Sequence, residues 1–408
     1  MMGGIAALSG DRESPGSLEA MAAALGHRGV ISGWSRGARV VSVGGASADE
    51  GLGRSGPMSL ALDGVILNSE ALGKELVSRG AWLPSGASAA TVLLQAVTAS
   101  SGATPVNQLI GALYRVMGGW AVVAAIPSGL VALRDPSGLR PLWMGRRDGV
   151  WGVATESSAL VAGGLDVLRG LAPGEMVLLG NSVESVRPFS RGAVRPCLRE
   201  RVVGLRLDAR VDDGGSPMDG YGLRHALGEV LAERHGAPAD VVVALDGAAG
   251  PVGAGFAARA GIPLVPAWAC GAPSWVASPS AVLEKRVVLT ILGDLPATDL
   301  AGAVGGLRRA GASSVHVRRA LPMRLSACPL GVDRTPWHGS PDASSSARAA
   351  ELGLVARADS ISALALEEVQ ERLGGVLAEG CGGCMGGQLA EGAGISPPTS
   401  QLALFQLG

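Results

Sequence analysis

The stretch Arg286–Asp333, RVVLTILGDLPATDLAGAVGGLRRAGASSVHVRRALPMRLSACPLGVD, decides the fold of the second half of the chain. Its opening run, Arg286–Ile291, is apolar and β-branched, which is typical of a buried strand. Thr298–Ala310 has helical spacing and stops before Gly311, and Ser314–Val317 has the composition of a second strand. This order predicts a βαβ unit of a parallel sheet.

The loop after the first of these strands is a candidate ligand site. In a parallel sheet such a loop lies at the carboxyl edge, where ligands bind. Gly293, Ala297 and Thr298 suit a loop whose amides face a phosphate at the start of a helix. A tight turn without a ligand explains the same residues, so both interpretations, a phosphate-binding loop and a simple turn, stay open.

Length and charge restrict the function classes. A chain of 408 residues is too long for one ordinary core, so we expect two domains. The formal net charge of -1 gives no electrostatic reason to expect nucleic acid or an acidic membrane surface as a partner. The first residues lack the basic segment of a signal peptide, and the uncharged stretch Ala260–Leu283 is interrupted by prolines. We therefore expect a cytoplasmic protein without a membrane span.

The first of the five cysteines is Cys197, so none lies in the first 196 residues, and two of them form a CxxC pair. An odd count with such a pair argues against a secreted disulfide scaffold and favours metal or redox chemistry.

Turn residues separate short apolar runs throughout residues 1–190, which predicts a layered α+β domain. The predicted helices are Ser17–Leu25, Ser69–Arg79 and Ala89–Ala99, and the predicted strands include Arg39–Val43, Met58–Leu67, Val150–Ala154 and Gly174–Leu179. Residues 191–408 alternate strands and helices instead. There we predict helices at Met218–Arg234, Val252–Ala260 and Ala363–Leu377, and strands at Asp240–Leu245 and Ile262–Val265.

Several motifs together resemble one family. HRG from His27, ALDGVILNSEALGKEL from Ala61, GGWAVVAAIPSGLVALRDPSGLRPLWMG from Gly118, ATESSAL from Ala154 and LAPGEMV from Leu171 resemble the class II glutamine amidotransferase half of amidophosphoribosyltransferase. DVVVALDGAAGPVGAGFAARAGIP from Asp240, the βαβ stretch and the CGGC tail resemble its phosphoribosyltransferase half. The resemblance implies an N-terminal-nucleophile-type α+β domain over residues 1–190, followed by an α/β type I phosphoribosyltransferase-like domain over residues 191–408.

Members of that family take part in purine biosynthesis. They hydrolyse glutamine at an N-terminal cysteine and pass the ammonia to a second site, where it displaces pyrophosphate from phosphoribosyl pyrophosphate. Their opening Cys-Gly-Ile is matched here by Gly3-Gly4-Ile5, and no cysteine precedes Cys197. Because glycine offers no nucleophile and loss of one costs on the order of a millionfold in turnover, we predict no glutaminase activity.

The rest of the implied glutamine site also departs from the family pattern. The arginine segment that grips the glutamine carboxylate has no counterpart between Arg39 and Met58. The His-Asn-Gly oxyanion element is matched by Leu62-Asp63-Gly64, which places a carboxylate where an amide donor is needed. The acidic residue that holds the substrate ammonium is matched by Ala89. His27, Arg28 and Gly29 are retained, and a structural turn explains them as well as a site does.

The implied phosphoribosyl loop differs in the same way. The family's two adjacent aspartates fall on Ile291 and Leu292, and its phosphate turn falls on Ala297-Thr298-Asp299. Losing both carboxylates is expected to cost roughly a hundredfold to ten-thousandfold in affinity, and little magnesium binding is expected. Asp294 is the one nearby acid that could substitute. The family's basic flexible loop is replaced by an apolar, proline-broken segment around Trp268 and Trp275.

Four cysteines match positions at which one branch of the family ligates a [4Fe-4S] cluster, namely Cys197, Cys328, Cys381 and Cys384. Four thiolates also suit a tetrahedral zinc, and burial as small apolar side chains is the alternative without a metal. The resemblance thus implies a retained cysteine site beside two altered catalytic centres.

Two hypotheses follow. In the first, the chain is a non-catalytic paralogue that acts as a scaffold or regulatory partner, as a homo-oligomer or in a hetero-oligomer with an active homologue. In the second, it is a transferase or ligand-binding enzyme of changed specificity, with the tryptophan segment shaping a new pocket.

Overall fold

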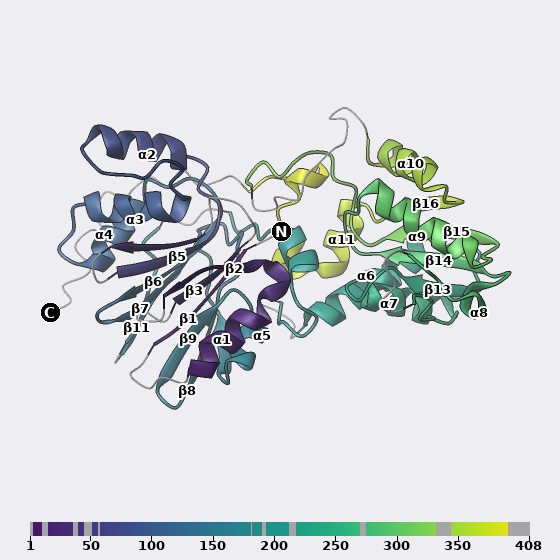
Figure 1. Cartoon of the computed structure of the whole chain (residues 1–408), viewed down its shortest axis with the longest axis horizontal. Coiled ribbons are helices and arrows are strands. Elements are labelled where there is room, and N and C mark those ends of the chain that lie inside the picture. The colour runs from purple at the N-terminus through teal and green to yellow at the C-terminus, as the bar shows by residue number, and fades with distance from the viewer. Residues whose placement is uncertain are drawn as a thin grey trace. The chain divides into compact units, whose positions relative to one another are not determined.

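The computed structural model describes residues 3–9, 15–35, 40–44, 51–55, 58–180, 182–189, 193–211, 218–269, 275–331 and 344–390. Their contacts divide into two compact units (Figure 1). The first holds the chain up to Glu200 and a short stretch that begins at Cys328, and the second holds Arg201–Ala327 and the later part of the chain up to Gln388. The division after Glu200 lies ten residues beyond the boundary placed at 190 from the sequence.

Within its described residues, the first unit contains two six-stranded antiparallel sheets. One has the order β10-β8-β9-β1-β3-β2 and the other has the order β12-β11-β7-β6-β5-β4. The strands are β1 Gly4–Leu8, β2 Val30–Ser35, β3 Val40–Gly44, β4 Gly51–Ser55, β5 Met58–Gly64, β6 Trp120–Ile126, β7 Gly129–Arg134, β8 Trp143–Arg147, β9 Val150–Ala154, β10 Asp166–Gly170, β11 Met176–Leu179 and β12 Val183–Val186.

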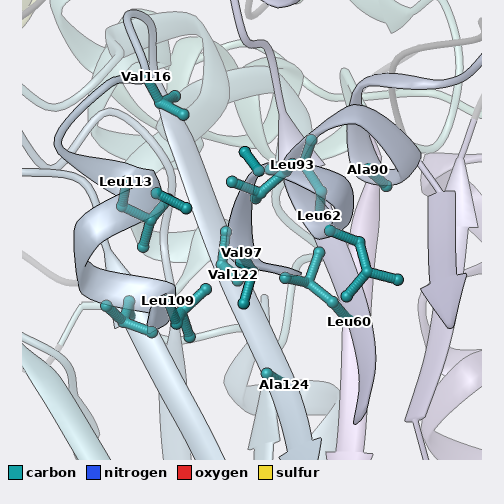
Figure 2. Close-up of a cluster of buried hydrophobic side chains, with 14 of the residues drawn as sticks. Leu60, Leu62, Ala90, Leu93, Val97, Leu109, Leu113, Val116, Val122 and Ala124 are labelled. Carbon is teal, nitrogen blue, oxygen red and sulfur yellow. The ribbon is translucent and has the colours of Figure 1, made fainter. Parts of the chain in front are cut away.

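Helices cover the outer faces of both sheets, so the unit has four layers (Figure 1). α2 Ser69–Ser78, α3 Ala89–Ala99 and α4 Pro105–Leu113 lie on the second sheet, and α1 Pro15–Ala24 and α5 Ser157–Ala162 lie on the first. Figure 2 shows leucines and valines of α3 and α4 packed over β5 and β6.

The strand β6, WAVVAAI, shows why the sequence of this unit contains continuous apolar runs. Val122 and Ala124 point into the core under the helices, whereas Ala121 and Val123 point into the core between the sheets. Because successive side chains of a strand face opposite ways, a strand buried on both faces must be apolar at every position.

In the part of the second unit that the structure describes, a parallel four-stranded sheet has the order β13-β14-β15-β16. Its strands are β13 Val241–Ala244, β14 Arg286–Ile291, β15 Ser314–Arg319 and β16 Ser360–Ala363. Its helices are α6 Gly220–Arg234, α7 Gly250–Ala260, α8 Pro279–Val282, α9 Ala297–Arg309, α10 Ser345–Ala356 and α11 Leu366–Leu373. β14, α9 and β15 form the predicted βαβ unit, and Gly311 has a φ of 94° where the helix ends. The predicted fold class is therefore confirmed.

Two local predictions for this unit are wrong. Ile262–Val265 forms only an isolated bridge between Leu264 and Val242, because Pro263 and Pro266 on either side have no N–H to donate to a ladder. The last helix is confined to α11, because Ala363 pairs in β16 and Gly374 adopts a φ of 61° that ends the helix. The helix α10 was not among those predicted from the sequence.

None of the helices in the described ranges is both long and apolar enough to cross a membrane.

Candidate functional site

Gly3, the position matched to the family nucleophile, directly precedes β1. Gly3 is buried, and its carbonyl oxygen accepts hydrogen bonds from two guanidinium groups. The Nη1 of Arg28 donates to it over 3.0 Å, and the Nη2 of Arg140 donates over 2.9 Å. Two arginine side chains therefore hold the backbone at the position that was matched to the family's thiol.

These two arginines belong to a network of buried charges in the first unit. Arg140 pairs with Asp63 and, over 2.7 Å, with Glu200. Arg28 pairs with Glu156 over 2.5 Å and with Glu200 over 2.6 Å. All five side chains are 0–1% exposed. Buried charges are stable only when paired, and here each carboxyl group is paired with at least one arginine of the chain itself.

The polypeptide turn that carries Arg140 is rigidly held. Asp135 accepts the backbone N–H groups of Ser137, Leu139 and Arg140 over 3.0–3.2 Å. Arg134 donates from its Nε to the carbonyl oxygen of Arg140 over 2.7 Å. Because its own turn is fixed at both ends, Arg140 is presented to the network in one position.

Asp63, the last but one residue of β5, was predicted to face an oxyanion. Its Oδ2 accepts a hydrogen bond from the Oγ1 of Thr155 over 3.0 Å, and Thr155 in turn accepts from the backbone N–H of Ile5 over 2.9 Å. Burial raises the pKa of Asp63, although the Arg140 guanidinium acts in the opposite direction. The carboxyl group is thus engaged by the protein on both oxygens.

The other residues predicted for the glutamine site are spread over the same unit. Arg28 ends the short 3-10 helix Gly26–Arg28, and Gly29 follows it. The Nε2 of His27, whose side chain is 31% exposed, lies 2.8 Å from Glu156. Gly64 has a φ of 119°, and a Cβ there would lie 2.2 Å from the carbonyl oxygen of Gly119. Ala89 begins α3 and packs in the core under the helices.

Sequence reasoning assigned no role to Arg140, Thr155, Glu156 or Glu200. The four residues lie in the motifs RDPSGLRPL, ATESSAL and RPCLRE. The only sequence signal was the presence of charged residues inside otherwise buried segments. Their pairing could not be read from that signal, because Arg28 and Glu156 are 128 residues apart.

The network predicts a pH dependence of stability. Burial alone would raise the pKa of Glu156, but Arg28 and His27 lower it from 4.5 to about 2. A carboxyl group whose pKa is depressed by folding stabilises the protein above pH 4.5 and loses that contribution as the pH falls towards 2. At neutral pH the contribution amounts to about 3 kcal/mol.

We therefore expect Glu156→Gln to be less stable than the unaltered protein by about 3 kcal/mol at pH 7 and by about half as much at pH 3. Glutamine mimics the protonated acid, so the difference isolates this one group. Urea denaturation at both pH values measures it, with the exposed Glu70→Gln as the control. A difference that does not change with pH would contradict the assignment.

In the second unit, the residues matched to the acidic pair are apolar and buried. Ile291 ends β14 with 1% exposure and Leu292 follows with 6%. Thr298 and Asp299 lie exposed in the first turn of α9. Asp294 lies 2.5 Å from the Nη2 of Arg319 and 3.5 Å from the Nη1 of Arg324. The one acid proposed as a substitute is therefore already engaged by arginines.

The two tryptophans of the apolar segment contact each other and the βα units. Their rings meet edge to face with centroids 5.2 Å apart. The Nε1 of Trp268 donates to the carbonyl oxygen of Ala244, the last residue of β13, over 2.7 Å. Trp275 packs against Gly302 and Gly306 of α9. The pair therefore lies against the carboxyl end of β13.

A separate hollow of about 860 Å³ lies between α10 and β16. It is lined by serines and small apolar residues, with His235 at one side. None of its lining residues belongs to the loop between β14 and α9.

The four cysteines of the predicted metal site are present as thiols. Cys197, Cys381 and Cys384 are buried, and Cys328 is half-buried. Thiolates are the donors that iron-sulfur clusters and structural zinc prefer, so the donor set fits either group. Within the described residues, no three His, Cys, Asp or Glu side chains are grouped to hold a metal ion.

Comparison with known proteins gives consistent matches. Residues 41–162 match the family model of a glutamine amidotransferase domain. The chain is 29% identical to the amidophosphoribosyltransferase of Rhizobium etli, over 78% of this chain and 68% of that protein. It is 27% identical to that of Bacillus subtilis, over 81% of this chain and 72% of that protein.

A solved structure has the same fold. It is the glutamine phosphoribosylpyrophosphate amidotransferase of B. subtilis complexed with ADP and GMP, which is 22% identical and superposes with a TM-score of 0.83. The match covers 97% of this chain and 98% of that one, so both units of the fold are shared.

Proposed function

Because this chain belongs to the amidophosphoribosyltransferase family of purine biosynthesis, we propose that it is a non-catalytic member that acts as a scaffold or regulatory partner. The observation that carries the proposal is the network of buried ion pairs around Gly3. A glutaminase of this type needs a nucleophile beside a free α-amino base and donors aimed at the developing oxyanion. In this chain, glycine stands at the nucleophile position, and Arg28 and Arg140 donate to its carbonyl oxygen.

The second unit supports the same proposal. Apolar Ile291 and Leu292 are matched to the acids of the family, and both side chains are buried. Without carboxylates at these positions, the ribose hydroxyls and the metal of phosphoribosyl pyrophosphate lose their charged partners. Asp294 cannot replace them while Arg319 and Arg324 hold it.

Calorimetric titration of the anaerobically purified protein with phosphoribosyl pyrophosphate and magnesium tests the proposal. We expect no binding at micromolar concentrations, and no release of glutamate from glutamine in a parallel assay. An active amidophosphoribosyltransferase measured in the same buffers is the positive control. Micromolar binding would instead favour an ammonia-dependent transferase or an enzyme of changed specificity and would overturn the non-catalytic assignment.

The scaffold role requires self-association or a partner. We propose that the chain forms a homo-oligomer, or a hetero-oligomer with an active homologue from the same organism. Co-expression of the two chains followed by size-exclusion chromatography and an activity assay measures this. Failure to associate together with an unchanged activity of the homologue would remove the regulatory role.

We also propose that Cys197, Cys328, Cys381 and Cys384 hold a [4Fe-4S] cluster, with zinc as the alternative. Such a cluster would supply structural cross-linking and no chemistry of the reaction. Iron, sulfide and zinc analysis of the anaerobic preparation distinguishes the two groups. A preparation without metal, in which the cysteine variants are as stable as the unaltered chain, would refute the site.

A further inference from the structure

An ion pair joins the loop between β14 and α9 to the end of β15. Asp294 follows β14 and its carboxylate lies 2.5 Å from the Nη2 of Arg319, the last residue of β15. Its second oxygen lies 3.5 Å from the Nη1 of Arg324. Because β14 and β15 are adjacent and parallel, these groups meet at the carboxyl edge of the sheet, where open α/β sheets bind ligands.

Both arginines are held by the backbone independently of Asp294. Arg319 donates from its Nε to the carbonyl oxygen of Leu321 over 2.8 Å and from its Nη2 to that of Pro322 over 3.0 Å. Arg324 donates from its Nε to the carbonyl oxygen of Ser326 over 3.4 Å. The guanidinium groups therefore keep their positions when the carboxylate is absent.

The members of this cluster differ in exposure. The side chains of Arg319 and Arg324 are 2% and 3% exposed, whereas that of Asp294 is 22% exposed. Arg348 of α10 adds a third buried guanidinium, which donates to the carbonyl oxygen of Arg324 over 3.0 Å. The cations are thus fixed in the interior, and Asp294 is the more exposed partner of both ion pairs.

We propose that Arg319 and Arg324 form a binding site for a phosphate group, which Asp294 occupies as a competing carboxylate of the chain itself. The planar guanidinium fork suits phosphate and carboxylate oxygens equally. A phosphate that enters displaces Asp294 and frees the loop between β14 and α9. While Asp294 occupies the site, it holds the loop between β14 and α9 at the carboxyl edge of the sheet. This proposal does not depend on whether the family reaction is retained.

Binding of inorganic phosphate to the full-length chain tests whether Asp294 competes with phosphate for this site. At constant ionic strength, we expect Asp294→Asn and Asp294→Ala to bind phosphate about tenfold to a hundredfold more tightly than the unaltered protein. Asp299→Asn is the matched control, because it removes the same charge from the exposed first turn of α9. It should change the affinity by much less. The double variant Asp294→Asn/Arg319→Gln should lose the gain.

Equal affinity in Asp294→Asn and the unaltered protein would overturn the proposal, as would a gain that persists without Arg319. A second test measures the melting temperature of the unaltered protein and needs no variant. Phosphate should raise its melting temperature more than chloride at equal ionic strength, and an identical effect of the two anions would also overturn the proposal. Phosphoribosyl pyrophosphate carries phosphate groups that this site would also bind, so its binding is measured to Arg319→Gln. Binding that persists in that variant bears on the proposed function alone, so the two can fail separately.

Discussion

Replacement of Arg140 by alanine is expected to lower the unfolding free energy of the first unit by about 3 to 5 kcal/mol, because it removes the cation paired with buried Asp63 and leaves Glu200 with Arg28. Arg140 pairs with both Asp63 and Glu200, and all three side chains are fully buried. For a domain of this size the loss corresponds to a fall in melting temperature of about 10 °C. Differential scanning calorimetry of the full chain measures it.

The matched control is Arg79→Ala on α2. Arg79 also pairs with a carboxylate, Glu75, over 2.7 Å, but its side chain is 69% exposed. Exposed pairs contribute about 0 to 1 kcal/mol, so this variant should melt close to the unaltered protein. Similar melting temperatures for Arg140→Ala and Arg79→Ala would show that the buried network does not hold the first unit together.

A double-mutant cycle separates the pair from the rest of the network. Asp63→Ala/Arg140→Ala removes the cation and one of the carboxylates that it neutralises. We expect the double variant to be more stable than the sum of the single losses predicts. Strict additivity would mean that Asp63 takes up a proton instead of relying on Arg140, a response that its raised pKa favours.

Gly255→Ala is expected to destabilise the second unit by about 3 kcal/mol through overpacking. A Cβ at Gly255 of α7 would lie 2.0 Å from the carbonyl oxygen of His225 on α6. The reciprocal contact is as close, since a Cβ at Gly228 of α6 would lie 2.1 Å from the carbonyl oxygen of Val252. The two helices therefore touch backbone to backbone, and an added methyl group must push them apart.

Gly250→Ala, at the start of the same helix, is the control because nothing lies within 4 Å of the added methyl group. It should leave the stability unchanged or raise it by about 0.4 to 1 kcal/mol, through the lower entropy of the unfolded chain. Hydrogen exchange of peptides from α6 and α7 reports on this unit alone. Equal protection in the two variants would contradict the close packing.

The local sequence pattern was sufficient to predict the bounds of elements that have clear apolar periodicity or a capping residue. β14 spans Arg286–Ile291 as predicted, and α3 spans Ala89–Ala99 as predicted, with Ser88 accepting a hydrogen bond from the backbone N–H of Thr91. Apolar periodicity and capping residues act within a few positions of the chain, so the sequence displays them directly. The order of elements and the family motifs then led to the confirmed fold class.

Long-range pairing decided the candidate sites. From the sequence alone, Asp63 was an isolated acid beside an oxyanion position, and Asp294 was an acid available to replace a lost ligand. The folded chain brings Arg140 to Asp63 from 77 residues away and Arg319 to Asp294 from 25 residues away. The sequence by itself determined which residues are matched to the family positions. Only the tertiary structure decided that the carboxylates of Asp63 and Asp294 are engaged by arginines, because the pairing of buried charges depends on contacts between distant segments.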